Sequence, residues 1–339
     1  MRCLQFLPGL EQAGVHVTVQ SLLPDDALQA RYLRSRYDLQ TVLGAYGARV
    51  KAMLQRHRFD LLWIEKEALP WLPAGLERWL LRGVPYMLDY DDAVFHTYDL
   101  HRSALVRRGL GRRLDKLMAG ARLVVGGNSY LAQRAHDAGA PWVELLPTVV
   151  DLDRYELKSA QAPVEDVPCI VWIGSPSTAR YLSLLGEPLR LLATRLPFRL
   201  RVIGGGTLSM QGVDIECVPW SEAAEAQAIQ AGDIGVMPLH DSPWERGKCG
   251  YKLIQYMACG LPVVASAVGV NPKIVTQGQD GYLARTVEDW TCALNTLLRD
   301  AALRTRMGLA GRQRVEQRYC LQQAAPRLAA WLRTAAGKD

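Results

Sequence analysis

Three basic residues stand close together in the stretch SPWERGKCGYK, directly before an apolar segment. They are Arg246, Lys248 and Lys252, and Gly247 and Gly250 lie between them. Cationic side chains beside the start of a helix favour a bound phosphate, because the first backbone N–H groups of a helix lack partners within it. Core packing requires none of these charges. The stretch therefore predicts a diphosphate site, and the alternative is a solvated basic loop.

A second stretch, WIGSPSTARYL, follows an expected buried strand and enters an expected helix. Gly174 and Ser175 leave backbone N–H groups accessible at the helix start, and Arg180 adds a positive charge. This pattern also fits phosphate, although a tight strand-to-helix turn with a surface arginine would look the same. The triple glycine at 204–206 is weaker evidence, because it lacks the GxGxxG spacing.

Acidic residues gather in the stretch DYDDAVFH, at the end of another expected strand. Asp89 and Asp91 could hold a divalent metal, or an aspartate could cap the following helix. His96 is the histidine nearest to these acids. A single histidine is more often structural, so a catalytic role for His96 is the bolder of two interpretations.

Composition limits the classes of protein to consider. The 339 residues are enough for two domains, and a hydrophobic content of 49% is ordinary for a globular protein. The seven cysteines are scattered without a CxxC pair, which favours a reducing compartment and argues against a structural metal site. The net charge of +6 gives no general basic character, and no nucleic-acid partner is expected.

Positive charge is concentrated in one segment, residues 102–122. The segment contains seven basic residues and a single acid, Asp115, which gives a local charge of +6. We expect one helix with an apolar stripe toward the core and basic residues on the other face. Such a face could dock on an anionic membrane surface, and the alternative is a solvated helix.

An uncharged segment runs from Leu253 to Pro272 and is long enough to be tested as a membrane span. Its middle contains Gly260 and Pro262, a combination that ends a helix, and valines follow. We therefore predict a helix, a turn and a buried strand.

Helical and strand periods alternate along the whole chain, which indicates parallel sheets with crossover helices. A polar, proline-containing linker near residues 153–167 separates two such series. The expected fold is α/β, with two doubly wound Rossmann-like domains that face a cleft. The expected strands of the first series are VHVTVQ, LLWI, YMLDY, LVVG and VELL; those of the second are CIVWIG, RLRVIGGG, VDIECV, DIGVMPL, the valine strand after Pro262, and GYLA.

Several segments together resemble glycosyltransferase family 4 (group 1). They are KLIQYMACGLPVVAS, WIGSPSTARYL, GNSYLAQRA and LLPTVVDLDRY. Members of this family are retaining enzymes of the two-domain GT-B fold that use nucleotide-sugar donors. The resemblance implies an acceptor domain at residues 1–157, a donor domain at 158–322, and a C-terminal helix at 323–339 that packs back toward the first domain.

This chain departs from the family pattern at important positions. The usual two glutamates, separated by seven residues, are replaced by Gly247 and Gln255. Gln255 can still hydrogen-bond a ribose hydroxyl, whereas Gly247 has no side chain to offer. The resemblance implies donor binding by Gly174, Ser175, Arg180, Arg246, Lys248, Gly250, Lys252 and Gln255.

The function implied by the resemblance is transfer of a sugar to a glycan or lipid-linked acceptor, in cell-envelope or exopolysaccharide synthesis. Asp91 or His96 would act at the reacting centre. The expected location is cytoplasmic, and peripheral on the inner face of the plasma membrane through residues 102–122. No cofactor and no essential metal are expected, since the helix start and the basic residues would take up the charge of the leaving diphosphate. The alternatives are a catalytically impaired GT-B binding protein and a GT-B sugar-nucleotide epimerase.

One expectation concerns the start of the chain. Members of the family begin with a strand and a glycine-rich turn, whereas this chain begins at the helix that should follow them. The missing strand would be the shared neighbour of VHVTVQ and YMLDY. We therefore expect the natural polypeptide to begin upstream of Met1.

Overall fold

The computed structural model describes residues 2–23, 38–157 and 167–338. The chain divides into two compact units. Unit 1 comprises Met1–Pro147 and Ala325–Asp339, and unit 2 comprises Thr148–Ala324. The first border thus precedes the expected one at residue 157. Most of the expected linker, residues 158–166, lies outside the described residues.

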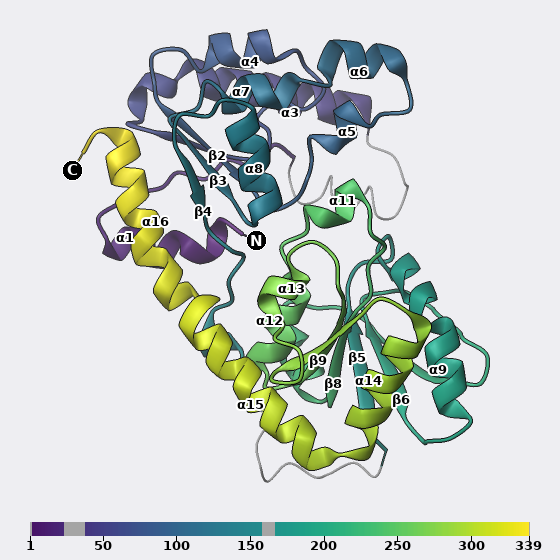
Figure 1. Cartoon of the computed structure of the whole chain (residues 1–339). Helices are drawn as coiled ribbons and strands as arrows, with labels where there is room; N and C mark the ends of the chain where they lie inside the picture. The colour runs from purple at the N-terminus through teal and green to yellow at the C-terminus, as the bar shows by residue number, and fades with distance from the viewer. Residues whose placement is uncertain (1, 24–37, 158–166, 339) are drawn as a thin grey trace. The chain divides into compact units, whose positions relative to one another are not determined.

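Unit 2 is built on a parallel sheet of six strands (Figure 1). Read from one edge to the other, its order is β7-β6-β5-β8-β9-β10, so β5, the first strand of this unit, is central and the chain winds outward in both directions. This is the predicted doubly wound arrangement. The strands are β5 (Cys169–Ile173), β6 (Arg199–Ile203), β7 (Asp214–Val218), β8 (Ile234–Met237), β9 (Val263–Ser266) and β10 (Gly281–Ala284).

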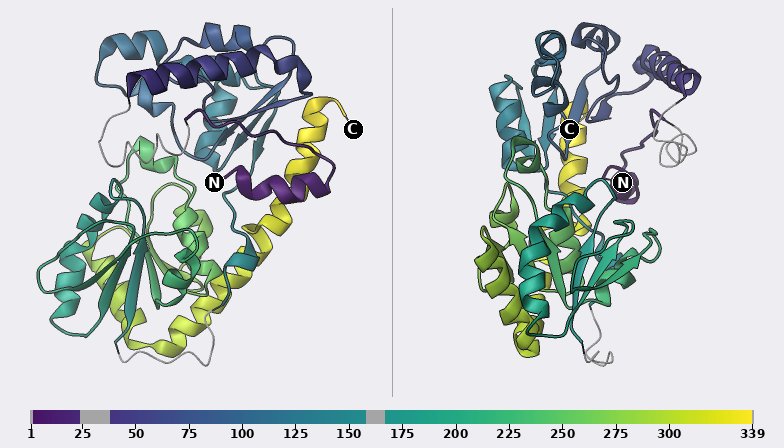
Figure 2. Two further views of the ribbon diagram at one scale, coloured as in Figure 1. Left: turned by 180° about the vertical axis from the view of Figure 1, so that it is seen from behind. Right: turned by 90° about the vertical axis from the view of Figure 1, so that its right-hand side faces the viewer.

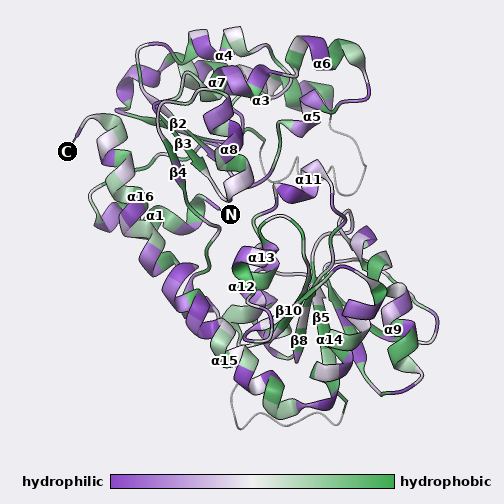
Figure 3. Cartoon of the chain, in the orientation of Figure 1, coloured by the Kyte–Doolittle hydropathy of each residue, from purple (hydrophilic) through white to green (hydrophobic). Residues whose placement is uncertain are grey.

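Hydrophobic cores cover both faces of this sheet, as a parallel sheet requires. Alternate residues of β5 divide between them: Val171 packs in one core and Trp172 in the other. The first core includes residues of α12 (Tyr251–Ala258) and α15 (Ala301–Arg318), and the second includes α9 (Gly186–Ala193) and α14 (Val287–Arg299). Figure 3 shows the strands as mainly hydrophobic.

The uncharged segment forms the predicted helix, turn and buried strand. Helix α12 ends at Ala258, Gly260 adopts φ +76°, and every residue of β9 is buried. Among the described helices, none has the length and apolar character needed to cross a membrane.

Unit 1 contains a parallel sheet with the order β1-β2-β3-β4. Its strands are β1 (Leu62–Glu65), β2 (Tyr86–Tyr90), β3 (Leu123–Gly126) and β4 (Val143–Leu145). Helix α8 (Ser129–Asp137) packs against β3 and β4. Its N-cap is Asn128, whose side chain accepts a hydrogen bond from the Leu131 amide.

The predicted strand VHVTVQ is absent: residues 15–20 carry no strand in the described structure. The expected strand partners were also wrong, because β2 pairs on both sides, with β1 and β3, and the edge strand is β1. A strand needs a hydrogen-bonding neighbour, and no described strand pairs with residues 15–20. Helix α3 (Leu39–Leu54) has Met53 as its one buried residue.

Residues 102–122 form two short helices rather than the single helix predicted. They are α6 (Ala104–Leu110) and α7 (Arg113–Met118), separated at Gly111 and Arg112. Leu114 and Leu117 are buried as expected, but so is Arg113. The basic face is therefore interrupted, since one of its charges lies in the core.

The last helix, α16 (Leu321–Ala336), begins in unit 2 and ends in unit 1. Within unit 1 it lies beside α1 (Leu7–Gln12), where Arg333 donates a hydrogen bond to the Ala13 carbonyl (Figures 1 and 2). The remaining helices are α4 (Ala74–Leu80), α5 (His96–Asp99), α10 (Glu225–Gln230), α11 (Pro243–Arg246) and α13 (Asn271–Ile274), with 3-10 turns at Leu4–Phe6, Arg56–Arg58, Leu152–Arg154 and Ala179–Leu185.

Candidate functional site

The structure brings Lys252 and Gly174 together at the carboxyl end of β5. Lys252 lies in the first turn of α12, and its Nζ is 4.1 Å from the centre of the Trp172 ring. A Cβ on Gly174 would lie 2.6 Å from this Nζ. The glycine therefore leaves room for the ammonium group at the edge of the sheet where ligands of doubly wound folds bind.

In the part of the chain that the structure describes, the charge of Lys252 has no acidic counterpart. Among the described residues, its amine makes no ion pair, and the Trp172 ring is its one electrostatic partner of opposite character. Burial, followed by repulsion from Lys248, lowers the pKa of Lys252 to about 7. An amine held in this way gains strongly from a bound anion, because the anion replaces the lost hydration and opposes the neighbouring charge.

The loop after Gly174 is ordered by its own hydroxyl groups. The Ser175 amide donates to the Thr178 Oγ1 at 3.1 Å, and the Ser175 hydroxyl lies 2.9 Å from that of Ser177. The helix expected here begins as a 3-10 turn at Ala179 and becomes α-helical at Gly186. The expectation that Gly174 and Ser175 leave accessible amides is wrong: the Gly174 amide donates to the Ile203 carbonyl, and the Thr178 and Ala179 amides donate to the Ser175 carbonyl.

Arg180 lies on the outside of this turn. Its side chain is 68% exposed, and its guanidinium group lies 5.1 Å from the centre of the Tyr181 ring. It also approaches Glu245 at 3.8 Å. Arg180 therefore belongs to the same region as Lys252 and remains accessible to a ligand.

Glu245 is a buried acid that the sequence analysis did not select. It accepts hydrogen bonds from the hydroxyl groups of Tyr181, at 2.5 Å, and Ser242. Burial by itself would raise the pKa of Glu245, but these hydrogen bonds outweigh it and hold the pKa below its usual value. The sequence feature that could have identified Glu245 is its position inside the basic stretch SPWERGKCGYK.

Two other predicted residues of this stretch have structural roles. Arg246 is exposed and forms a two-point ion pair with Asp241, at 2.7 and 3.1 Å. Gly250 precedes α12 with φ +68°, and a Cβ there would lie 2.2 Å from the Ile274 Cδ1. Glycine is therefore required at this position for both backbone and packing reasons.

Gln255 is buried in a polar network beneath α12. Its Nε2 donates to the Tyr155 hydroxyl at 2.9 Å and to Glu225 at 2.8 Å. Glu225 also accepts from the indole nitrogen of Trp220, a side chain that is 42% exposed. Contact between Gln255 and a ribose stays a prediction. Glu225 and Trp220 are polar and aromatic groups of the same region that sequence reasoning missed.

In unit 1, Asp91 lies just beyond the end of β2 and pairs with Lys66. The two groups are 3.0 Å apart, and both side chains are partly exposed. Lys66 has φ +63°, a left-handed conformation that is uncommon for a residue with a side chain and is often found at functional sites. Asp89, by contrast, is buried and pairs with Arg2, and burial raises its pKa to about 6.

His96 is buried in α5, and both of its ring nitrogens have partners. Its Nδ1 lies 2.7 Å from Asp99 and its Nε2 lies 2.8 Å from the Tyr130 hydroxyl. These contacts hold α5 against α8. A catalytic role for His96 stays a prediction, and the geometry gives it a positioning role.

Trp71 lies in the same loop as Lys66 and presents an aromatic surface. It is 49% exposed, adopts φ +63°, and packs edge-on against Tyr98 with 5.2 Å between ring centres. The Tyr98 hydroxyl accepts a hydrogen bond from the Trp71 amide and donates one to Glu67. The loop after β1 is therefore held rigidly with an exposed indole.

Most of the described part of unit 2 is similar to a known protein family. Residues 167–300 match the family model described as glycosyl transferases group 1. This domain covers the central sheet of unit 2, Gly174 and Lys252.

Curated relatives match at low identity over variable lengths. D-inositol 3-phosphate glycosyltransferase of Mycobacteroides abscessus is 26% identical over 312 residues, which is 78% of this chain and 64% of that protein. Sulfoquinovosyl transferase SQD2 of Arabidopsis thaliana is 35% identical over 97 residues, 27% of this chain and 18% of that protein. The chain thus spans less than two thirds of these relatives.

Solved structures share the fold over most of the chain. Sucrose-phosphate synthase from Thermosynechococcus elongatus superposes with a TM-score of 0.68 at 18% identity, over 88% of this chain and 79% of the other. Anabaena HepE in complex with UDP-glucose also gives 0.68, at 16% identity, over 96% and 88%. The fold is GT-B, with two Rossmann-like domains.

Proposed function

We propose that this chain is a retaining glycosyltransferase of family 4 that uses a nucleotide-sugar donor. The observation that carries the proposal is the position of the Lys252 amine beside Gly174, where it has no acidic partner among the described residues. The donor diphosphate would bind there, with Lys248 as a further donor. Similarity to a UDP-glucose-binding protein supports this choice of ligand.

The proposed reaction proceeds on one face of the donor sugar. The bond between the anomeric carbon and the diphosphate oxygen breaks, and the acceptor hydroxyl forms its bond from the same side. The leaving phosphate oxygen takes the acceptor proton. Lys252 and Lys248 stabilise the negative charge that develops on the diphosphate, the role that a metal has in other transferases. Neither a metal nor another cofactor is required in this proposal.

Unit 1 would supply the acceptor side. Asp91 would orient the acceptor hydroxyl, and His96 would position the loop through Asp99 and Tyr130. The exposed ring of Trp71 would suit a sugar face. We propose a glycan or lipid-linked acceptor of envelope or exopolysaccharide synthesis, and an enzyme that is cytoplasmic and peripheral on the membrane.

A specific observation favours one other function, a nucleotide-sugar-binding protein with impaired catalysis. Gly247 has no side chain for the donor sugar, and the Gln255 amide nitrogen is committed to Tyr155 and Glu225. Such a protein would bind nucleotide sugars without hydrolysing them.

The test uses a panel of nucleotide sugars and two variants. Thermal shift identifies the donor, and hydrolysis of that donor without acceptor then measures transfer to water. Lys252→Ala should weaken donor binding by about 1.5–3 kcal/mol, the value of a charge-assisted hydrogen bond. Arg190→Ala, at an exposed site on α9, is the control. Binding without hydrolysis would favour the impaired protein, and absence of binding would contradict both functions.

A further inference from the structure

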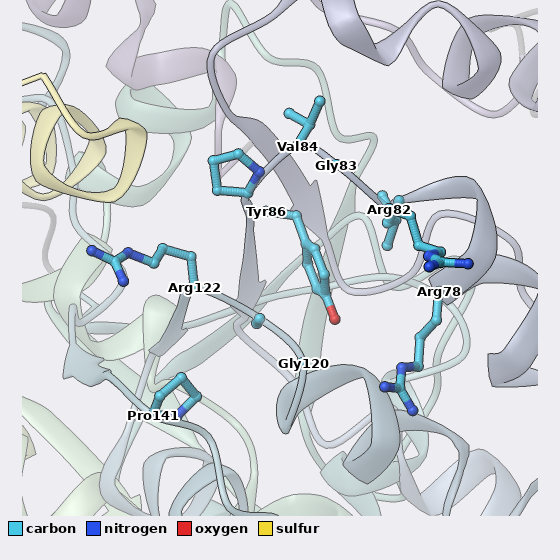
Figure 4. Close-up of a pocket in the computed structure, with 11 residues that line it drawn as sticks. Arg78, Arg82, Gly83, Val84, Tyr86, Gly120, Arg122 and Pro141 are labelled. Carbon is cyan, nitrogen blue, oxygen red and sulfur yellow. The ribbon is translucent and has the colours of Figure 1, made fainter.

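A second pocket lies in unit 1, at the edge of the sheet where β2 and β3 begin (Figure 4). Its volume is about 430 Å³, within the range of about 300–1,000 Å³ typical of small-molecule sites. Asp91 lies beyond the opposite end of β2. The pocket is therefore separate from the proposed acceptor side and has no part in the proposed reaction.

Three arginines line this pocket: Arg78, Arg82 and Arg122. They come from the last turn of α4, from the loop after it and from the residue before β3. All three are exposed, and none makes a side-chain hydrogen bond or ion pair with another residue in the described part of the chain. No described aspartate or glutamate lines the pocket.

The other polar group of the pocket cannot neutralise this charge. The Tyr86 hydroxyl donates to the Leu117 carbonyl at 2.7 Å, and burial raises its pKa to about 12, so it stays protonated. Arg56 adds positive charge nearby, because its Nε donates to the Arg82 carbonyl. The pocket thus gathers like charges that repel one another unless an anion lies among them.

The shape of the pocket depends on a glycine. A Cβ on Gly120 would lie 2.7 Å from the Tyr86 hydroxyl and 3.7 Å from the Arg78 Nε. Glycine therefore keeps the space beside these two groups open. Figure 4 shows Arg78 and Arg82 on one side of the Tyr86 ring and Arg122 on the other. An anion bound over the ring could contact guanidinium groups from both sides.

We propose that this pocket binds a phosphate group. Guanidinium groups present several N–H donors in a fixed plane and pair with phosphate through two parallel hydrogen bonds. Arg78 and Arg82 would hold the phosphate, and Arg122 would close the site. The phosphate belongs either to a small phosphorylated molecule or to a phospholipid headgroup, and both present the same chemistry.

The experiment compares Arg78→Gln/Arg82→Gln with a control that loses the same charge, Arg306→Gln/Arg318→Gln on α15, where both residues are exposed. Calorimetry follows inorganic phosphate at constant ionic strength. Sedimentation follows vesicles of phosphatidic acid, with phosphatidylcholine vesicles for comparison. Arg122→Gln is a milder third variant that tests the other side of the pocket.

We expect the pocket variant to bind about ten- to a hundredfold more weakly than the control, because charge-assisted hydrogen bonds are lost. Loss of the free-phosphate signal would identify a small phosphorylated ligand, and loss of vesicle binding alone would identify a lipid headgroup. Both measurements are repeated in the Lys252→Ala background, where phosphate bound at the proposed donor site no longer contributes, and the difference between the pocket variant and the control should persist there. Equal binding by the pocket variant and the control, or no binding by the native chain, would overturn the proposal.

Discussion

The protonated amine of Lys252 is unfavourable in the unliganded protein, and the same property favours binding of an anion. Its amine is desolvated beside Trp172 and repelled by Lys248, so the folded protein binds its proton less tightly than an exposed lysine would. A bound anion offsets this desolvation and repulsion, so the protonated form of Lys252 becomes more stable in the complex. The protonation of Lys252 should therefore be coupled to binding of the diphosphate.

Donor affinity should depend on pH through this group. With a pKa of about 7, Lys252 is charged below neutrality and loses its proton above it. The charged form binds the diphosphate, so affinity should fall by up to about tenfold per pH unit above pH about 7 and level off at lower pH. Calorimetry with an intact nucleotide sugar measures this, since its phosphate diesters do not titrate in this range.

Lys252→Arg supplies the control for this dependence. Arginine remains charged throughout this pH range. The variant should bind the diphosphate more weakly, because a guanidinium group differs in shape from an amine, but its affinity should be nearly independent of pH. If the native chain shows the same flat profile, the lowered pKa of Lys252 has no part in binding.

At the scale of elements, the start of α12 depends on a backbone conformation that a side chain resists. Gly250→Ala should destabilise unit 2 by about 1–3 kcal/mol, since it forces a Cβ toward Ile274 at φ +68°. Gly186→Ala, at the right-handed start of α9 with nothing near its Cβ, should be neutral or stabilising. Thermal unfolding of both variants measures the difference, and equal midpoints would contradict this account of Gly250.

Helix α7 is anchored by a buried arginine. Arg113 pairs with Glu67 and Glu77 and donates to the Leu69 and Leu72 carbonyls. Burial raises the pKa of both glutamates, and Arg113 is the cation that forms an ion pair with both of them. The sequence predicts Arg113 as part of a basic surface, whereas in the structure it holds the loop after β1 to α4 and α7.

Substitution separates these two roles of neighbouring arginines. Arg113→Ala should cost about 3–5 kcal/mol of unfolding free energy, because two buried acids lose their countercharge. Arg112→Ala removes an 84% exposed side chain and should change it by no more than about 0.5 kcal/mol. Urea unfolding gives both values. Similar costs would show that Arg113 is not the anchor.

For the whole molecule, the remaining basic surface of unit 1 bears on where the protein works. Arg102, Arg107, Arg108 and Arg112 are exposed, and Leu105 between them is 80% exposed. Basic residues near an anionic bilayer contribute about 1 kcal/mol each, and an apolar side chain can enter the interface. Docking on a membrane would bring the enzyme to a lipid-linked acceptor.

Arg102→Gln/Arg108→Gln should weaken binding to anionic vesicles by about 2 kcal/mol, and added salt should release the native chain. Sedimentation with phosphatidylglycerol vesicles measures both effects, with Arg306→Gln/Arg318→Gln as the charge-matched control. Failure of the native chain to sediment with these vesicles at low salt would rule out electrostatic docking.

The sequence by itself determined most of the elements and their order. Continuous apolar runs such as CIVWI and VVAS predicted buried parallel strands, and Gly260 and Pro262 marked the turn between α12 and β9. Local signals are sufficient there because each element carries its own period and its own breaker. Glycines and basic residues also located the loop of Lys252, although the sequence did not reveal Glu245 as a buried acid.

Only the tertiary structure decided which neighbours each element has. VHVTVQ alternates as a strand should, yet it forms none, because pairing requires a partner that local pattern does not supply. Arg113 and Arg112 are equivalent in the sequence and opposite in burial, since Glu67 and Glu77 are distant along the chain. The arginine pocket likewise joins α4 to the start of β3. The sequence shows which residues are charged. Contacts between distant segments decide which partners these residues have, and therefore whether they are buried ion pairs or exposed charges.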